Sequence, residues 1–149
     1  MFGCEQKFYD LTVSIIYSNN LPDESEFFDL FETTGWNEAY KLKQDKLFMA
    51  LRNSWFMVSA YNKQKLVGFG RIICDGVVHA LILDLIVLPQ FIGYGIGGRI
   101  LEDLVKKCKD HNIRDIQLFS AKGKTSFYEK RGFLKRPDDA PGMEYKLNI

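Results

Sequence analysis

Apolar residues recur at every second position in several short stretches of the chain, and this spacing is typical of β-strands. The longest apolar stretch, 77–88, follows the dipeptide Asp75–Gly76, which is a strong hairpin signal. Because nearly every position in it is apolar, we expect both of its faces to be covered. The strands predicted in this way cover residues 11–17, 55–61, 66–74, 77–88, 115–120, 133–135 and 143–147.

Apolar residues at intervals of three and four predict the helices. Phe27, Leu30 and Phe31 have this spacing, and Gly35 ends their segment. The stretch 97–109 has the clearest pattern, since its apolar residues share one face and lysines fill its last turn, where the helix dipole is negative. The predicted helices cover residues 22–34, 39–53, 97–109 and 124–131.

The order of these elements indicates the fold class. Most strands come first, as a meander, and later strands alternate with helices. This order predicts an α+β fold, a mixed α/β sandwich in which helices cover both faces of a central sheet. The length of 149 residues fits a single domain, 1–149, which is large enough to fold without a disulfide or a metal.

Charge and composition narrow the class of protein. The 20 basic and 19 acidic residues leave a net charge of +1, without the clustered basic face expected of a nucleic-acid-binding protein. Cys4, Cys74 and Cys108 are widely spaced, and only two histidines are present, which argues against a disulfide framework or a metal site. The longest apolar run contains His79 and Asp84 and is too short for a membrane span, and the N-terminus lacks an apolar signal core. We therefore expect a soluble, cytoplasmic protein with no membrane or nucleic-acid partner.

The most informative segment is VLPQFIGYGIGG, from Val87 to Gly98. A buried strand ends here, and closely spaced glycines open an amphipathic helix. Glycine lets the backbone turn tightly and bring its N–H groups against a ligand. The first turn of a helix also has unpaired N–H donors and a partial positive charge. Together these properties predict an anion site suited to phosphate.

Three alternative interpretations of these glycines are weaker. Gly93, Gly95 and Gly98 match a GxGxxG dinucleotide pattern literally, but they follow an antiparallel meander and do not open a βαβ unit. A Walker loop is excluded because no Gly-Lys-Ser/Thr sequence follows. The simplest alternative is that small residues only let the helix pack closely on a strand.

The segment VLPQFIGYGIGGRIL resembles the coenzyme A-binding motif of the GNAT superfamily of N-acetyltransferases. LVGFGRIICDG before it and SFYEKRGF after it are similar to the family's strand-hairpin and late helix, in the same order. The resemblance covers about residues 55–149 and, more weakly, 27–54. It implies a GNAT-like acyl-CoA N-acyltransferase fold, with a mostly antiparallel sheet whose two parallel strands splay apart. FETTGW, RIICDG and PGM are further similar to a bacterial and plastid subgroup that includes arylalkylamine (serotonin) and lysine acetyltransferases.

Two positions depart from the family pattern. The family motif Q/R-x-x-G-x-G/A places its Gln or Arg on Ile92 when Gly97 lies at the helix start, which is the register we prefer. The literal match starts two residues earlier, at Gln90. Lys122 stands where relatives often have an asparagine, and it either pairs with a coenzyme phosphate or is solvated. The resemblance implies that acetyl-CoA is bound by Leu85, Ile86, Val87, Ile92, Gly93, Tyr94, Gly95, Ile96, Gly97, Gly98, Lys122 and Tyr128.

Acetyl transfer to an amine needs a neutral amine, a donor for the oxyanion and a proton for the leaving thiolate. Tyr128 matches the family tyrosine that faces the coenzyme sulfur, and it is the predicted general acid; the alternative is an aromatic that packs on the sheet. Asp84 is the only acid in the long apolar strand and is the predicted base, through water. The alternative for Asp84 is a carboxylate capped by backbone amides or paired with Arg71. His79 lies too early on the strand, and a structural role is favoured for it.

Aromatic residues near the first two helices predict the acceptor site. Relatives use this region to cover the acceptor, so the resemblance implies contacts from Phe31 and Trp36. The alternative is plain core packing, which is favoured for Phe27 and Phe31, whereas Trp36 follows Gly35 in a loop.

Three functions fit these features. The favoured one is acetylation of a small-molecule amine, either an arylalkylamine or a polyamine. The second is acetylation of a protein lysine or N-terminus, and the third is acyl-CoA binding without catalysis. Because terminal strands pair between subunits in many relatives, a homodimer is the expected state.

Overall fold

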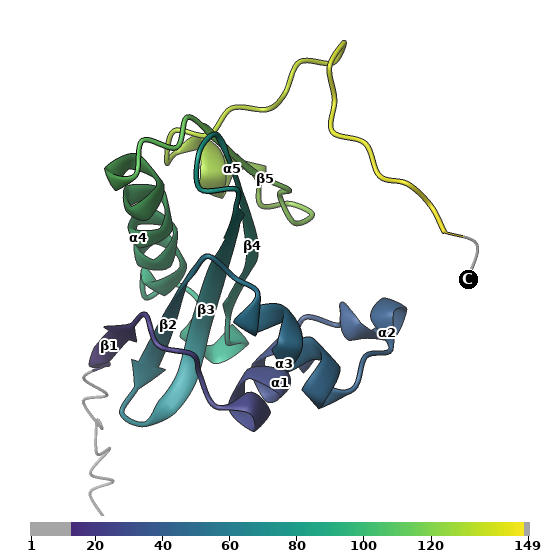
Figure 1. The fold of residues 1–149 in the computed structure, drawn as a ribbon. Coiled ribbons are helices and arrows are strands. Elements are labelled where there is room, and N and C mark those ends of the chain that lie inside the picture. The colour runs from purple at the N-terminus through teal and green to yellow at the C-terminus, as the bar shows by residue number, and fades with distance from the viewer. Residues whose placement is uncertain (1–12, 148–149) are drawn as a thin grey trace, which may run out of the picture. The chain divides into compact units, whose positions relative to one another are not determined.

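The computed structural model describes residues 13–147, and the chain divides into two compact units, the first ending at Gln117 and the second beginning at Leu118 (Figure 1). Cys4, the N-terminal segment and the start of the strand expected at 11–17 lie outside the described residues. The strands are β1 (Ile15–Ser18), β2 (Phe56–Asn62), β3 (Lys65–Cys74), β4 (His79–Val87) and β5 (Asp115–Leu118). The helices are α1 (Glu24–Glu32), α2 (Asn37–Tyr40), α3 (Gln44–Arg52), the 3-10 turn Pro89–Phe91, α4 (Ile96–Asp110) and α5 (Thr125–Glu129).

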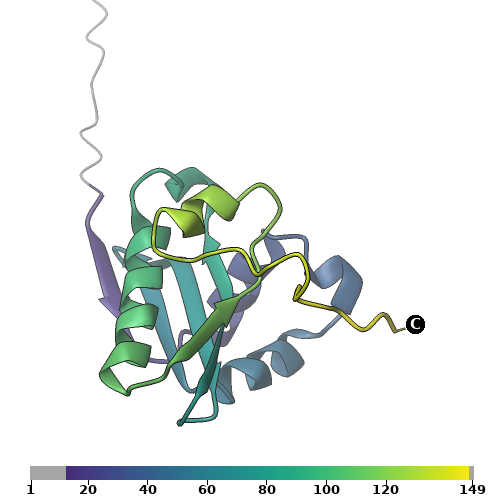
Figure 2. The same ribbon diagram turned by 90° about the horizontal axis from the view of Figure 1, so that it is seen from above.

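The strands form one sheet in the order β1-β2-β3-β4-β5 (Figure 2). Neighbouring strands from β1 to β4 are antiparallel, and β5 forms the parallel pair with β4. The prediction of a mixed, mostly antiparallel sheet is therefore confirmed.

Helices cover both faces of this sheet. Successive residues of β3 point to opposite faces, and each face contacts a different helix. Gly68 and Gly70 face α4, since a Cβ at either position would lie within 3.0 Å of apolar side chains of that helix. Phe69, between them, faces the other side and meets Phe27 of α1, with ring centroids 4.8 Å apart. Figure 1 shows α4 on one side of the sheet, and α1 with α3 on the other.

Two predictions about secondary structure are wrong. The helix expected at 39–53 is two helices, because Lys41 adopts a left-handed conformation, with a φ of 54°. The Asn37 side chain holds this break, since it donates to the carbonyl of Leu42 and accepts from its N–H, both at 3.0 Å.

The strands expected at 133–135 and 143–147 do not form. Alternating apolar residues supply only a pattern, and a strand also needs a neighbour to pair with. Between residues 133 and 147, the described backbone N–H groups make turn bonds only, such as Ala140 N–H to the Pro137 carbonyl at 3.0 Å. Met143, Tyr145 and Leu147 are correspondingly exposed.

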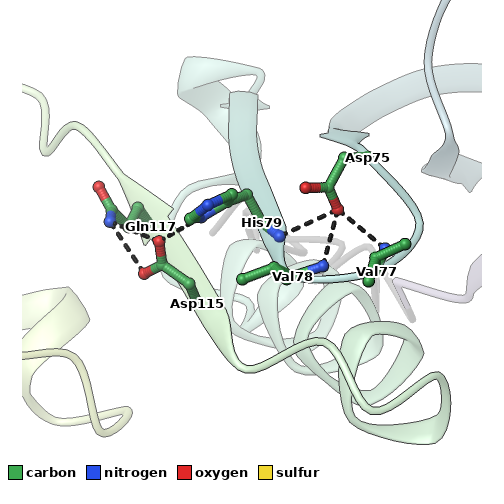
Figure 3. A network of polar contacts seen from close by, with 6 residues as sticks. All are labelled: Asp75, Val77, Val78, His79, Asp115 and Gln117. Atoms are coloured by element: carbon green, nitrogen blue, oxygen red, sulfur yellow. Dashed lines mark hydrogen bonds and ion pairs between the residues drawn. The ribbon is translucent and has the colours of Figure 1, made fainter.

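The far end of the β3–β4 hairpin is held by a polar network (Figure 3). Asp75 Oδ1 accepts hydrogen bonds from the backbone N–H groups of Val77, Val78 and His79, at 2.8, 2.8 and 3.0 Å. The His79 ring contacts Asp115 at 2.6 Å and so links the start of β4 to the start of β5. His79 therefore has a structural role at the start of β4, at the opposite end of that strand from the glycine-rich turn.

Candidate active site

The glycine-rich segment is a compact turn between β4 and α4. Leu88 N–H donates to the Val67 carbonyl at 2.8 Å, so the chain stays attached to β3 as it leaves the strand. Pro89 then starts one turn of 3-10 helix, where its fixed φ is favourable and its missing N–H costs nothing. Ile92 N–H closes this turn on the Pro89 carbonyl at 3.3 Å.

Gly93 and Gly95 are required for their backbone conformation. Their φ angles are 95° and 77°, in the left-handed region that other residues adopt only at a cost. A Cβ at either position would meet nothing within 4 Å, so these glycines face open space. The alternative that they only permit close packing is therefore wrong for Gly93 and Gly95.

The turn presents a row of backbone N–H groups that have no hydrogen-bond partner in the described part of the chain. None of the six N–H groups from Gly93 to Gly98 donates to an acceptor among residues 13–147. The first amide in this series that does is that of Arg99, which donates to the Gly95 carbonyl at 3.1 Å. These free donors begin the 15-residue helix α4, whose dipole adds positive potential at this end. The arrangement can bind an anion with phosphate-like oxygens.

The position of α4 agrees with the preferred register of the motif. The helix begins at Ile96, one residue before the predicted start, so Gly97 lies in its first turn as the preferred register requires. Ile92 then occupies the Gln/Arg position, and its side chain is 61% exposed beside the turn. An isoleucine side chain cannot donate to a phosphate, so the backbone N–H groups from Gly93 to Gly98 have to supply the donors that this position lacks.

Strand β4 reaches the turn through a bulge. Gly68 and Phe69 pair with Val87 and Ile86, whereas Arg71 pairs with Leu83, so β4 has one residue more than β3 over this interval. Asp84 lies within the bulge with a φ of 52°, a conformation that aspartate tolerates better than most residues. The sequence contains no clear signal for this bulge.

One edge of β4 is open next to the turn. Asp115 N–H donates to the Val78 carbonyl at 3.0 Å, so β5 starts beside the start of β4. Because β5 has four residues and β4 has nine, β5 ends before β4 reaches its last residues. No described strand pairs with that edge of Leu85–Val87, so its N–H and C=O groups can pair with an amide-bearing ligand.

Asp84 is paired with Arg71, as one of the two interpretations of its place in the sequence predicts. Arg71 Nε donates to Asp84 Oδ2 at 2.5 Å, and the two side chains are 11% and 16% exposed. The Arg71 Nη1 group also donates to the Ala50 carbonyl at 3.3 Å and to Ser54 Oγ at 3.4 Å. An arginine in the middle of an apolar strand is the sequence signal for this network.

The aromatic residues expected at the acceptor site differ in exposure. Phe31 is 2% exposed and packs in the core against Phe27, whereas Trp36 is 38% exposed. The Trp36 ring meets the Phe31 ring nearly edge to face, with centroids 5.8 Å apart. Trp36 thus presents an aromatic surface that the buried Phe31 supports.

Tyr128 and Lys122 belong to the second unit. Tyr128 lies on α5, and its ring packs edge-on against Phe127 and Phe133, at 5.0 and 6.1 Å between centroids. Burial raises the pKa of the Tyr128 hydroxyl above its usual value, so the phenol keeps its proton at neutral pH. Lys122 is exposed in the turn before α5. The roles predicted for both residues stay predictions.

Within 13–147, no three His, Cys, Asp or Glu side chains gather in the way that a metal ion would need. No helix in the same range combines the length and the apolar character of a membrane span.

Comparison with known proteins identifies relatives along most of the chain. The acetyltransferase (GNAT) domain family matches residues 26–141. A protein of Pyropia yezoensis named uncharacterized N-acetyltransferase ycf52 is 34% identical over 92% of this chain and 78% of its own. A soybean protein named histone acetyltransferase TAP1 is 30% identical over 80% of this chain and 55% of its own.

Solved structures show the same fold. A Staphylococcus aureus protein described as a probable acetyltransferase is similar with a TM-score of 0.80 and 26% identity, over 90% of this chain and all of its own. A GNAT-family acetyltransferase of Streptococcus pneumoniae has a TM-score of 0.77 and 24% identity, over 91% of this chain and all of its own.

Proposed function

The chain is an acetyltransferase that belongs to the GNAT family, and from this membership we propose that it moves an acetyl group from acetyl-CoA to a primary amine. The observation that carries the proposal is the row of free N–H groups from Gly93 to Gly98, next to the open edge of Leu85–Val87. A coenzyme combines the two ligand chemistries that these features require. Its pyrophosphate suits the N–H groups at the start of α4, and the amides of its pantetheine arm suit the strand edge.

The reaction we propose is direct attack in a ternary complex. The nitrogen lone pair of the neutral amine attacks the thioester carbonyl, and the C–S bond breaks as the tetrahedral intermediate collapses. The amine loses one proton to a base, and the leaving thiolate gains one from an acid, so no proton is lost overall. Tyr128 is the proposed acid because burial keeps its hydroxyl protonated.

Asp84 is the proposed base, acting through a water molecule. Its ion pair with Arg71 fixes one carboxylate oxygen, Oδ2, and the other oxygen stays available for a water. The competing role is structural, in which the pair only holds the bulge of β4 in place. Removal of both charges at once separates these two roles, because it restores the balance of charge but not the base.

A small-molecule amine is the acceptor that we favour. Trp36 offers a half-exposed aromatic ring on a rigid support, and such a surface suits the ring of an arylalkylamine or the chain of a polyamine. A protein lysine is the second candidate, because a soybean relative bears the name histone acetyltransferase. A cytoplasmic location and a homodimer stay predictions.

A panel assay tests this proposal. The purified chain is mixed with acetyl-CoA and with one acceptor at a time: an arylalkylamine, a polyamine, a lysine-containing peptide and no amine. Release of the coenzyme thiol is then followed together with the mass of the acetylated product. We expect turnover with a small amine, and turnover only with the peptide would favour the second candidate. Coenzyme binding without turnover on any acceptor would leave a non-catalytic binding module.

A further inference from the structure

Two cysteines lie at corresponding ends of the contact between β3 and α4. Cys74 is the last residue of β3, and Cys108 lies in the last turns of α4. Both are free thiols; Cys74 is half-buried, and Cys108 is fully buried. The proposed transfer of an acetyl group uses neither of them.

The packing register of β3 on α4 brings them together. The Cβ direction of Gly68 points at Ile96 and Ile100, and that of Gly70 points at Ile100 and Leu104. Two residues along the strand, about 6.6 Å, thus correspond to four along the helix, about 6.0 Å. Extended by two further steps, this register would set Ile72 beside Leu104 and Cys108, and Cys74 beside Cys108.

Two other observations agree with this register. Ile72, on the same face of β3, is completely buried, as the contact with α4 requires. Burial raises the pKa of the Cys108 thiol to about 11, and the neighbouring sulfur of Cys74 is a second cause of that shift.

The helix also lies unusually close to the strand. A Cβ on Gly70 would lie 2.8 Å from Ile100 Cγ2, and one on Gly68 would lie 2.9 Å from Ile96 Cγ2. The absence of both Cβ atoms lets the two backbones approach each other. A disulfide usually joins residues whose Cα atoms are roughly 4.4–6.8 Å apart, and a close contact between helix and strand favours that spacing.

We propose that Cys74 and Cys108 are a redox pair that forms a reversible intramolecular disulfide. The oxidant is a small disulfide, RSSR, such as that of a cellular thiol. The Cys74 thiolate attacks one sulfur of RSSR, and one RS⁻ leaves with both electrons of the broken S–S bond. The Cys108 thiolate then attacks the Cys74 sulfur of the mixed disulfide and expels the second RS⁻. The two protons from the cysteines convert both RS⁻ ions to RSH, so the balance is protein dithiol plus RSSR to protein disulfide plus two RSH.

The order of attack follows from exposure. Cys74 is reachable from solvent at the hairpin, where its Sγ accepts a hydrogen bond from Gly76 N–H at 3.2 Å. Cys108 is shielded, so it reacts only with the sulfur of Cys74. Because a thiolate is the nucleophile, the second step is slow at neutral pH and quickens about tenfold for each unit of pH.

The cross-link would enclose every coenzyme contact proposed in the first unit. Residues 75–107 between the two cysteines include β4, the glycine-rich turn and most of α4. Oxidation would therefore fasten both ends of the segment that carries the free N–H groups. A closed loop of this length should raise the thermal unfolding midpoint by on the order of 10 °C.

Mass spectrometry of the oxidised protein tests the pair. A Cys4→Ser background removes the third cysteine, and the folded protein is incubated with excess oxidised glutathione at pH 7 and pH 9. After alkylation of free thiols, trypsin cleavage should yield peptide 72–99 joined to dipeptide 108–109 by a disulfide. The joined species should form faster at pH 9, disappear with a dithiol reductant and accompany the rise in the unfolding midpoint.

Two single variants serve as controls. Cys74→Ser and Cys108→Ala should each lose both the joined peptides and the rise in midpoint on oxidation. Cys108→Ala should instead retain one glutathione on Cys74. The proposal is overturned if the Cys4→Ser protein, still folded by circular dichroism, keeps glutathione on Cys74 while Cys108 is alkylated at both pH values. Coenzyme binding by the reduced protein is measured separately, so a failure here leaves the proposed function untouched.

Discussion

Arg71 of β3 and Asp84 of β4 form a mostly buried ion pair across the two strands, at the bulge that precedes the glycine-rich turn. Through Arg71 the pair also reaches the end of α3, at Ala50 and Ser54. The bulge, the helix on one face and the strand that leads to the turn are thus connected by a single guanidinium group. Removal of either partner leaves the charge of the other without a counter-ion and largely shielded from solvent.

Replacement of Asp84 should destabilise the fold, even where the new side chain has nearly the same size. We expect Asp84→Asn to lower the free energy of unfolding by about 3 kcal/mol, because Arg71 then keeps an uncompensated charge. Urea denaturation measures this change. The exposed helix pair Arg99–Asp103 is the matched control, and Asp103→Asn should cost only about 0.5 kcal/mol. Equal costs at the two sites would contradict the role of burial.

A double variant separates structure from catalysis at the same pair. Arg71→Met with Asp84→Asn removes both charges, so most of the lost stability should return. If Asp84 is the base, kcat of this stable double variant still falls by about 100-fold or more. A kcat equal to that of the wild type would leave Asp84 with a structural role only.

Gly70 should control the position of α4. In Gly70→Ala the new Cβ lies 2.8 Å from Ile100 Cγ2, so the helix must move away from the sheet. We expect a loss of about 1–3 kcal/mol in the free energy of unfolding, together with weaker coenzyme binding. Gly76→Ala is the control, since a Cβ there meets nothing within 4 Å and its positive φ strains only the hairpin. That variant should lose stability without losing affinity.

Tyr128→Phe should remove a proton donor and leave the coenzyme bound. We expect kcat to fall by about 100-fold with little change in KM for acetyl-CoA. Burial raises the pKa of this hydroxyl above the pKa of an ordinary tyrosine, which is about 10. The wild-type enzyme should therefore lose activity through deprotonation of Tyr128 only at a pH above that value. The pH profile of the variant should lack that alkaline fall. An unchanged kcat would remove Tyr128 from the mechanism.

Asp75 should stabilise the hairpin in a pH-dependent way. Hydrogen bonds from the N–H groups of Val77, Val78 and His79 lower the pKa of its carboxyl in the folded state. Its contribution is therefore complete above the unfolded-state pKa, about 4, and disappears as the pH falls through the lower folded-state value. The stability difference between wild type and Asp75→Ala should shrink below about pH 4. A difference that stays constant from pH 7 to pH 2.5 would exclude this linkage.

The sequence predicted those parts of the molecule in which residue type and backbone conformation are tightly linked. Gly93 and Gly95 have positive φ angles, which favour glycine, so the glycines in the sequence predict the turn between strand and helix. The apolar stripe of α4 likewise placed its ends within one residue, at Ile96 and Asp110. Such elements can be predicted because their residues have strong local conformational preferences and their apolar positions recur at a regular period.

Other features depend on contacts that a local pattern does not contain. The break at Lys41 rests on a side chain four residues away, that of Asn37. The bulge at Asp84 arises from the pairing of β4 with β3, and the apolar pattern of this stretch does not predict it. The segment 143–147 alternates like a strand, yet the described chain gives it no ladder partner. The break at Lys41 thus depends on one side-chain contact, whereas the bulge and the unpaired segment depend on strand pairing.

The most direct test of the central claim is the dissociation constant of acetyl-CoA, measured by isothermal titration for wild type, Gly95→Val and Gly76→Val. Both glycines have φ angles near 80° and open space around a Cβ, so the two variants suffer similar backbone strain. If the N–H groups of the turn bind the pyrophosphate, Gly95→Val loses at least about tenfold in affinity, and Gly76→Val binds like the wild type. Equal affinity in all three folded proteins, or no binding by the wild type, would contradict the assignment of this turn as the coenzyme site.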